Sequence, residues 1–337
     1  MSPARNGLFF AVVVAASLGF AYWLYAPDAT QSLPPESATT APALFYPDLS
    51  SKLDQVTQMR VQSAEHDLRF VKTALGWQES QFHYPIREKL LSSVLKAIAQ
   101  MRKLEPKTSN PAFYTNIGVD EKDVKEAGSY RFSVQGQEKV LADFLLGNAK
   151  ESRSELPNQW FVRAVDAPTS WLVEGKFPVR ADLNRWLDTR VFPLQGADLA
   201  KLVVRQDGVG DLVMARQEAN QWKVVSMPKG FQDQSKDQPE MIDANLLRIE
   251  FTDLVARSSV KLKDKPDWIV ELYLQSGEGL RLQVYDQPKS LVAVMSFLAL
   301  EGVAPSKTAI ALAPYVQAWK QVALTFPKEE LKGLMQP

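Results

Sequence analysis

The 337-residue chain contains no cysteine, and its only histidines are His66 and His83. Without a thiol there is no disulfide, no thiolate zinc site, no cysteine nucleophile and no lipid-modified cysteine of a bacterial lipoprotein. Two histidines leave little for acid–base or metal chemistry near neutral pH. A chain without thiols suits an oxidising envelope, although many cytoplasmic proteins also have few cysteines.

Net charge is absent too, because 39 lysines and arginines balance 39 aspartates and glutamates. No basic run with interleaved aromatics is present, which argues against a nucleic-acid partner. Hydrophobic residues make up 45 % of the chain, as in a globular protein with a buried core. The length is typical of about two domains.

Residues 8–26, LFFAVVVAASLGFAYWLYA, carry no charge. As a helix they would span about 28 Å, close to the roughly 30 Å hydrocarbon core of a bilayer. Arg5 precedes this segment, and the next basic residue is Lys52. The positive-inside rule then predicts a single-pass inner-membrane protein, with residues 1–7 in the cytoplasm and the body in the periplasm.

A cleavable signal peptide is the alternative, since Gly19-Phe20-Ala21 offers small residues after an apolar stretch. The apolar run continues to Ala26, which favours a retained anchor that contacts the lipid bilayer through residues 8–26. Residues 27–43 are rich in Pro, Ser, Thr and Ala and predict a flexible linker.

Two parts of the body resemble each other. Each begins with two alternating, strand-like segments and then reaches a tryptophan, Trp77 or Trp222. The strand pairs are residues 56–62 with 68–72, and residues 199–205 with 212–216. Later strand-like segments are residues 130–135, 139–146, 160–165, 170–174, 268–275 and 279–285.

An amphipathic helix is predicted in each part after that tryptophan. The first covers Ile86 to Met101; the second has Asp243 as its N-cap. Its apolar stripe is formed by Leu246, Leu247, Phe251, Leu254 and Val255. Each part also has a late helix, containing Trp186 or Trp319 and followed by an aromatic–proline step. The sequence thus predicts an α+β fold of two similar halves, residues 44–195 and 196–337, built of antiparallel hairpins with amphipathic helices.

Candidate catalytic motifs have simpler structural explanations. Ser93 and Lys96 match a serine-x-x-lysine pattern but fall inside a predicted helix, with no Lys-Thr-Gly partner. Neither histidine is placed like a member of a serine–histidine–acid triad. Residues 207–211, DGVGD, suit a hairpin turn better than a calcium loop. No catalytic, metal-binding or cofactor-binding residue is therefore predicted.

Several motifs resemble the bacterial domain of unknown function 4340 family across most of residues 50–330. They are YPIREKLLSSVLKAI from Tyr84, Pro106-Lys107-Thr108, FYTNIGV from Phe113, WFVRAVDAPTSWLVEG from Trp160, and Trp186-Leu187-Asp188. The resemblance implies a single-pass envelope protein, often encoded beside ABC transporter subunits of the gliding-motility type. It assigns no functional residue.

The favoured hypothesis is a non-catalytic accessory or scaffold protein of an inner-membrane complex, with ABC transporter subunits as partners. The alternative is a periplasmic module that binds envelope glycan or peptide through exposed tryptophans. A third reading is an envelope hydrolase that uses two carboxylates alone.

Overall fold

The computed structural model describes residues 42–122, 124, 129–150, 159–177, 183–217, 221–229 and 241–331. The predicted anchor, residues 8–26, and most of the predicted linker lie outside these residues. From Leu44 onward the chain forms one compact unit. Within the described residues, no helix is both long enough and apolar enough to cross a membrane.

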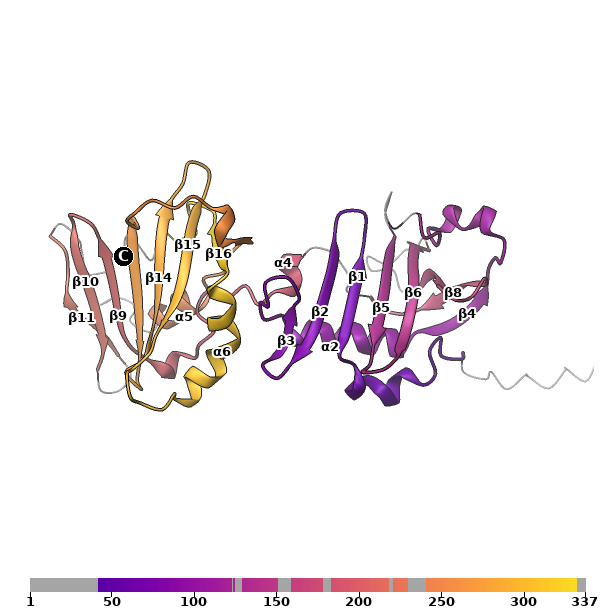
Figure 1. Ribbon diagram of the computed structural model, residues 1–337, viewed down its shortest axis with the longest axis horizontal. Helices are drawn as coiled ribbons and strands as arrows, with labels where there is room; N and C mark the ends of the chain where they lie inside the picture. The colour runs from indigo at the N-terminus through magenta and orange to yellow at the C-terminus, as the bar shows by residue number, and fades with distance from the viewer. Residues whose placement is uncertain are drawn as a thin grey trace, which may run out of the picture. The chain divides into compact units, whose positions relative to one another are not determined.

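Two antiparallel sheets of eight strands each dominate this unit (Figure 1). The first contains β1 (Gln58–Gln62), β2 (Asp67–Thr73), β3 (Gly76–Glu79), β4 (Arg102–Pro106), β5 (Tyr130–Gln135), β6 (Val140–Ala149), β7 (Gln159–Ala164) and β8 (Ser170–Glu174). The second contains β9 (Leu199–Gln206), β10 (Gly210–Arg216), β11 (Trp222–Ser226), β12 (Asp253–Ala256), β13 (Trp268–Leu274), β14 (Gly279–Asp286), β15 (Leu291–Leu298) and β16 (Val322–Phe326).

The two sheets have the same topology. Their strand orders are β3-β2-β1-β5-β6-β7-β8-β4 and β11-β10-β9-β13-β14-β15-β16-β12, so each strand of the first has a counterpart in the second. The registers agree as well. Buried Met59 lies opposite Phe70, and buried Leu202 lies opposite Met214 at the equivalent position. The prediction of an α+β body with two similar halves is confirmed.

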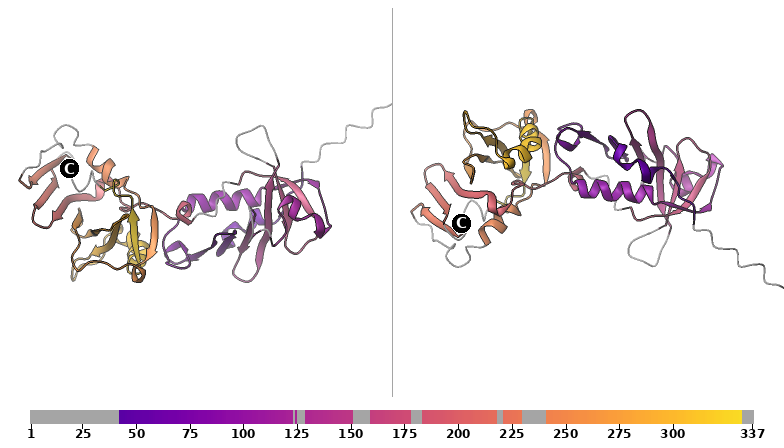
Figure 2. Two further views of the ribbon diagram at one scale, coloured as in Figure 1. Left: turned by 90° about the horizontal axis from the view of Figure 1, so that it is seen from above. Right: turned by 90° about the horizontal axis from the view of Figure 1, so that it is seen from below.

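A helix connects the third and fourth strands of each half, which lie at opposite edges of the sheet. In the first half this is α2 (Glu88–Ala99), which buries Leu91, Val94 and Ile98. Figure 2 shows α2 running along one side of the strands. Its counterpart is the shorter α5 (Met241–Leu247). The inward apolar residues of the first sheet form a buried core with α2, and those of the second sheet with both α5 and α6 (Lys307–Trp319).

The other helices are α4 (Leu183–Trp186), α6 and the 3-10 helices η1 (Leu49–Gln55), η2 (Pro111–Phe113), η3 (Thr115–Ile117), η4 (Gly196–Asp198) and η6 (Arg257–Ser259). Of these, α4 and α6 differ between the halves, whereas η1 and η4 each precede the first strand of a half, and η2, η3 and η6 follow the fourth strand.

Two details of the helix predicted in the second half are wrong. Helix α5 ends at Leu247, and Leu254 and Val255 lie in β12, where backbone pairing with β16 replaces helical hydrogen bonds. Asp243 is in the first turn of α5 instead of at its N-cap, and its carboxylate accepts hydrogen bonds from Arg216 and Trp222.

The two late tryptophans are not equivalent either. Trp186 lies in α4, which follows β8, the last strand of the first sheet. Trp319 lies in α6, which precedes β16, the corresponding strand of the second sheet. The aromatic–proline steps that follow them therefore belong to different places in the fold.

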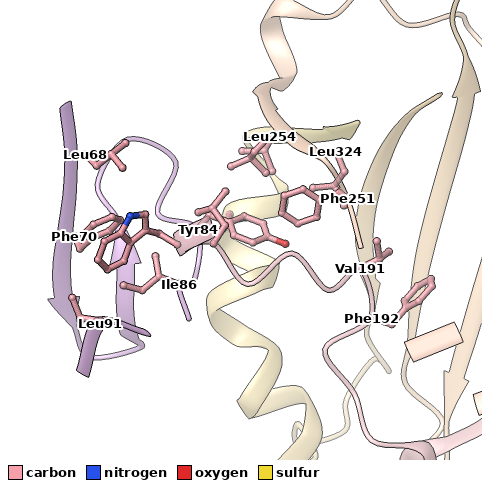
Figure 3. Close-up of a cluster of buried hydrophobic side chains, with 14 of the residues drawn as sticks. Leu68, Phe70, Tyr84, Ile86, Leu91, Val191, Phe192, Phe251, Leu254 and Leu324 are labelled. Atoms are coloured by element: carbon pink, nitrogen blue, oxygen red, sulfur yellow. The ribbon is translucent and has the colours of Figure 1, made fainter. Parts of the chain in front are cut away.

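The segment that links the halves is packed on both sides. Ile86 forms a β-bridge with Leu187, and Arg190 forms one with Glu250. Tyr84 is fully buried and packs edge-on against Phe251, with ring centroids 5.5 Å apart. Figure 3 shows this cluster, in which apolar side chains from the two halves and from the link meet.

Two tyrosines at this junction differ in their hydrogen bonding. The Tyr315 hydroxyl on α6 donates to Asp188 Oδ2 at 2.6 Å. Burial alone would raise the pKa of Asp188, but hydrogen bonds from Arg190 and Tyr315 outweigh it and lower that pKa. The Tyr84 hydroxyl is buried beside the Trp319 indole N–H, and neither group makes a hydrogen bond of ordinary geometry among the described residues.

We predict opposite outcomes for removing the two hydroxyl groups. Tyr315→Phe should lower the free energy of unfolding by about 1–2 kcal/mol, because it leaves a buried carboxylate with one donor fewer. Tyr84→Phe should leave stability unchanged or raise it slightly, because it removes an unsatisfied buried hydroxyl. Chemical denaturation of both variants measures this, and a larger loss for Tyr84→Phe would contradict the packing described.

Candidate functional site

The outward faces of the sheets are only partly covered. In the first half, the chain between β4 and β5 covers Leu145 with Tyr114 and Val119. In the second half, the chain between β12 and β13 places Val260 and Leu262 against Tyr285. These two small clusters occupy equivalent places. Neither cluster extends over β1, β2 and β5 or over their counterparts β9, β10 and β13.

A polar hollow of about 290 Å³ lies on this uncovered part of the first sheet. Strands β1, β2, β5 and β6 form its floor, because their outward residues alternate with buried ones. The lining consists of Gln58, Arg60, Gln62, Arg69, Arg131, Ser133, Gln135, Val140 and Asp143.

Two arginine–carboxylate pairs frame the hollow. Arg60 donates from Nε and Nη2 to Asp67, at 2.6 and 2.5 Å. Arg131 donates in the same two-pronged way to Asp143, at 2.9 and 2.8 Å. The hydrogen bonds from Arg60 lower the pKa of Asp67. Planar pairs of this kind hold both guanidinium groups in fixed orientations.

Other polar groups of the hollow are unused. Among the described residues, the side chains of Gln58, Gln62, Gln135 and Ser133 have no hydrogen-bond partner. Arg69 is half-exposed and approaches Asp67 only at 3.8 Å, beyond hydrogen-bond distance. The site therefore offers amide, hydroxyl and guanidinium groups to a polar partner.

The equivalent place on the second sheet is filled by the protein itself. The registers of β1, β5 and β6 and of β9, β13 and β14 put Glu271 where the first half has Ser133. The Glu271 side chain is 1 % exposed. Its carboxylate accepts hydrogen bonds from Arg205 at 2.6 Å, Arg281 at 2.7 Å and Tyr273 at 3.0 Å.

This network fixes the charge of Glu271. Burial raises its pKa, but the hydrogen bonds from Arg205, Arg281 and Tyr273 outweigh burial, so the net shift is downward. One carboxylate thus satisfies two guanidinium groups and a hydroxyl. No comparable group projects from Ser133 in the first sheet.

The residues singled out from the sequence lie elsewhere. The Ser93 hydroxyl donates to the Lys89 carbonyl one turn back in α2, at 2.8 Å. The backbone N–H of His66 bonds to Ser63 in the β1–β2 turn, and His83 precedes Tyr84 with φ of 55°. Residues 207–209 form the turn between β9 and β10, which confirms the hairpin prediction. Asp211 pairs with Arg205 at 3.1 Å.

The tryptophans do not form an exposed platform in the part of the chain that the structure describes. Trp186, Trp222 and Trp319 are buried, and the other described tryptophans are half-buried. Nor do the described residues contain a group of three histidines, aspartates or glutamates that could hold a metal ion.

Sequence reasoning missed the hollow. Its residues lie on strands that the alternation of apolar and polar residues predicts well, yet the polar side of each strand looks like an ordinary solvated face. The difference between Ser133 and Glu271 becomes visible only once cross-strand register aligns the two halves.

A protein-family model described as a domain of unknown function, DUF4340, matches residues 77–265, more than half of the chain. The chain belongs to the DUF4340 family. This confirms the resemblance seen in the sequence motifs. No curated protein and no solved structure matches the chain. The DUF4340 match starts in β3 and ends before β13, so it crosses from one half into the other.

We predict that Glu271→Gln destabilises the protein in a pH-dependent way. The folded-state pKa of Glu271 is below its ordinary value of 4.5, so its stabilising effect is complete above that pH and is lost as pH falls below it. The difference in unfolding free energy between wild type and variant should be about 1–2 kcal/mol at pH 7 and shrink below pH 4.5.

Denaturant unfolding between pH 3 and 7 measures this difference. Glu301→Gln, at an exposed turn, is the matched control and should show no such trend. A difference for Glu271→Gln that stays constant over this pH range would contradict the assigned network.

Proposed function

We propose that the chain is a non-catalytic, membrane-anchored envelope protein that binds a component of an inner-membrane complex through the hollow on its first sheet. The unused polar groups around Ser133 are the observation that supports this most directly. Buried or half-buried groups without partners on a sheet face are suited to hydrogen bonding with another molecule.

The sequence supplies the setting for this proposal. A retained anchor at residues 8–26 would hold the protein in the inner membrane with its body in the periplasm. A flexible linker of 17 residues would let that body reach roughly tens of ångströms from the bilayer. The family resemblance makes ABC transporter subunits the favoured partners.

A periplasmic ligand-binding module is the second candidate, because the hollow has a volume near the lower end of small-molecule pockets, roughly 300 Å³. Its lining is mostly charged and amide side chains, whereas small-molecule sites are mostly apolar. A protein surface with polar side chains therefore fits better than an enclosed small ligand.

Hydrolysis by two carboxylates has less support. Among the described residues, Asp143 is the only carboxylate that lines the hollow, and Arg131 engages both of its oxygens. A carboxylate mechanism needs two such groups across the substrate, one of them protonated.

We predict that a photoreactive amino acid at Val140, in the full chain in its native cells, forms an adduct with a membrane protein. Val140 lines the hollow and is 55 % exposed. The matched control is Val225 on β11 of the second sheet, which is 62 % exposed and should not give the same adduct. Adduct formation at Val140 no greater than in the chain without the photoprobe would overturn the proposal, as would equal adducts from both positions.

A further inference from the structure

The duplicated fold allows a position-by-position comparison of the two outward faces. Across three neighbouring strands, the first sheet places Arg60, Ser133 and Asp143 side by side. The second sheet places Val203, Glu271 and Arg281 in the equivalent row. A carboxylate projects from the middle of the row in the second sheet, and a short hydroxyl stands there in the first.

The position of the charges, and not their number, differs between the two rows. Around the hollow, three arginines, at positions 60, 69 and 131, face two carboxylates, at positions 67 and 143; Glu121 also acts on Arg131 but is paired with Arg163. Around Glu271, two arginines, at positions 205 and 281, face two carboxylates, at positions 211 and 271. Lys201 stands apart from that network, exposed to solvent over the ring of Tyr273. In each sheet the hydrogen-bonded arginines and carboxylates are balanced, and one further cation stands beside them, Arg69 in the first sheet and Lys201 in the second.

From this comparison we infer that the hollow receives one carboxylate over Ser133, supplied by an aspartate or glutamate side chain of the partner protein. The carboxylate lies where Glu271 lies in the second sheet but is bound by other groups, because Gln62 and Asp143 occupy the positions of Arg205 and Arg281. This inference rests on the proposed function and specifies the chemistry of the partner. Arg69, the least engaged of the three arginines, supplies the charge, and Ser133 and the glutamine amides supply hydrogen bonds.

Charge and access favour this occupant over others. A single carboxylate neutralises the charge of Arg69, whereas a phosphate group would bring up to two negative charges. The hollow is open to protein side chains because Val140 and Arg69 at its rim are exposed. A side chain presented by a partner surface reaches such a site without being enclosed.

Two peptides that differ only in this group test the inference. The full chain, with ¹⁵N-labelled arginine and in detergent micelles, is titrated with N-acetyl-Gly-Glu-Gly-amide and with its Gln counterpart. The Nε resonances of Arg60 and Arg69, assigned from single variants, should shift saturably with the Glu peptide and stay unchanged with the Gln peptide.

Variants of the hollow sharpen the test. Ser133→Glu supplies an internal carboxylate, as Glu271 does, and should abolish the peptide-induced shifts. Arg69→Gln leaves the core untouched and should weaken binding about three- to tenfold. Ser226→Glu adds the same charge at an exposed site on β11 and should bind like the wild type.

Equal shifts with both peptides, or undiminished binding by Arg69→Gln and Ser133→Glu, would overturn the inference. Acetate is the third probe. If acetate binds as tightly as the Glu peptide, the hollow is a site for a free carboxylate and not for a partner side chain. These outcomes are separate from the proposed function. If the Val140 adduct forms but the Glu peptide does not bind, the proposed function stands and this inference fails, because the partner is then bound through a group other than a carboxylate.

Discussion

Each half of this protein depends on one topological constraint. The third and fourth strands lie at opposite edges of an eight-stranded sheet, so the chain between them must cross the whole sheet. In the first half α2 lies in this crossing and buries its apolar side, and in the second half α5 and α6 both contribute to the buried face. The inward residues, such as Phe132 and Val270, become core, while the outward residues of the same strands remain polar. The two halves inherit the same uncovered face.

That face is where the two halves differ chemically. In the second sheet, Glu271 closes a network with two arginines and a tyrosine, and the surface is satisfied internally. In the first sheet, Ser133 leaves the equivalent place open among polar side chains that line the hollow. In a duplicated fold, one copy can serve as a structural support while the other is free to bind a partner. The packed junction around Tyr84 and Phe251 joins the two halves in one unit.

Much of the fold was predictable from the sequence because it rests on local patterns. Alternation in residues 56–62 and 199–205 and the Asp-Gly turn at 207–208 specify hairpins within a few residues. The sequence predicts a helix where β12 lies, because apolar residues at 251, 254 and 255 fit both the helical and the strand period. The pairing of β12 with β16, about 70 residues later, is a tertiary effect. Strand β4 lies at a sheet edge and is mostly exposed, so its sequence shows no alternation of apolar and polar residues that would predict a strand. The hollow depends on cross-strand register, which local patterns do not encode.

Hydroxyl-radical footprinting of the full chain, in native membranes and after purification, tests most directly whether the uncovered face of the first sheet is the partner-binding surface. We expect Val140 to be oxidised more slowly in native membranes than in the purified chain, and Val225 on the second sheet to be oxidised equally in both. Equal oxidation of Val140 in the two preparations, or protection of Val225 alone, would contradict it.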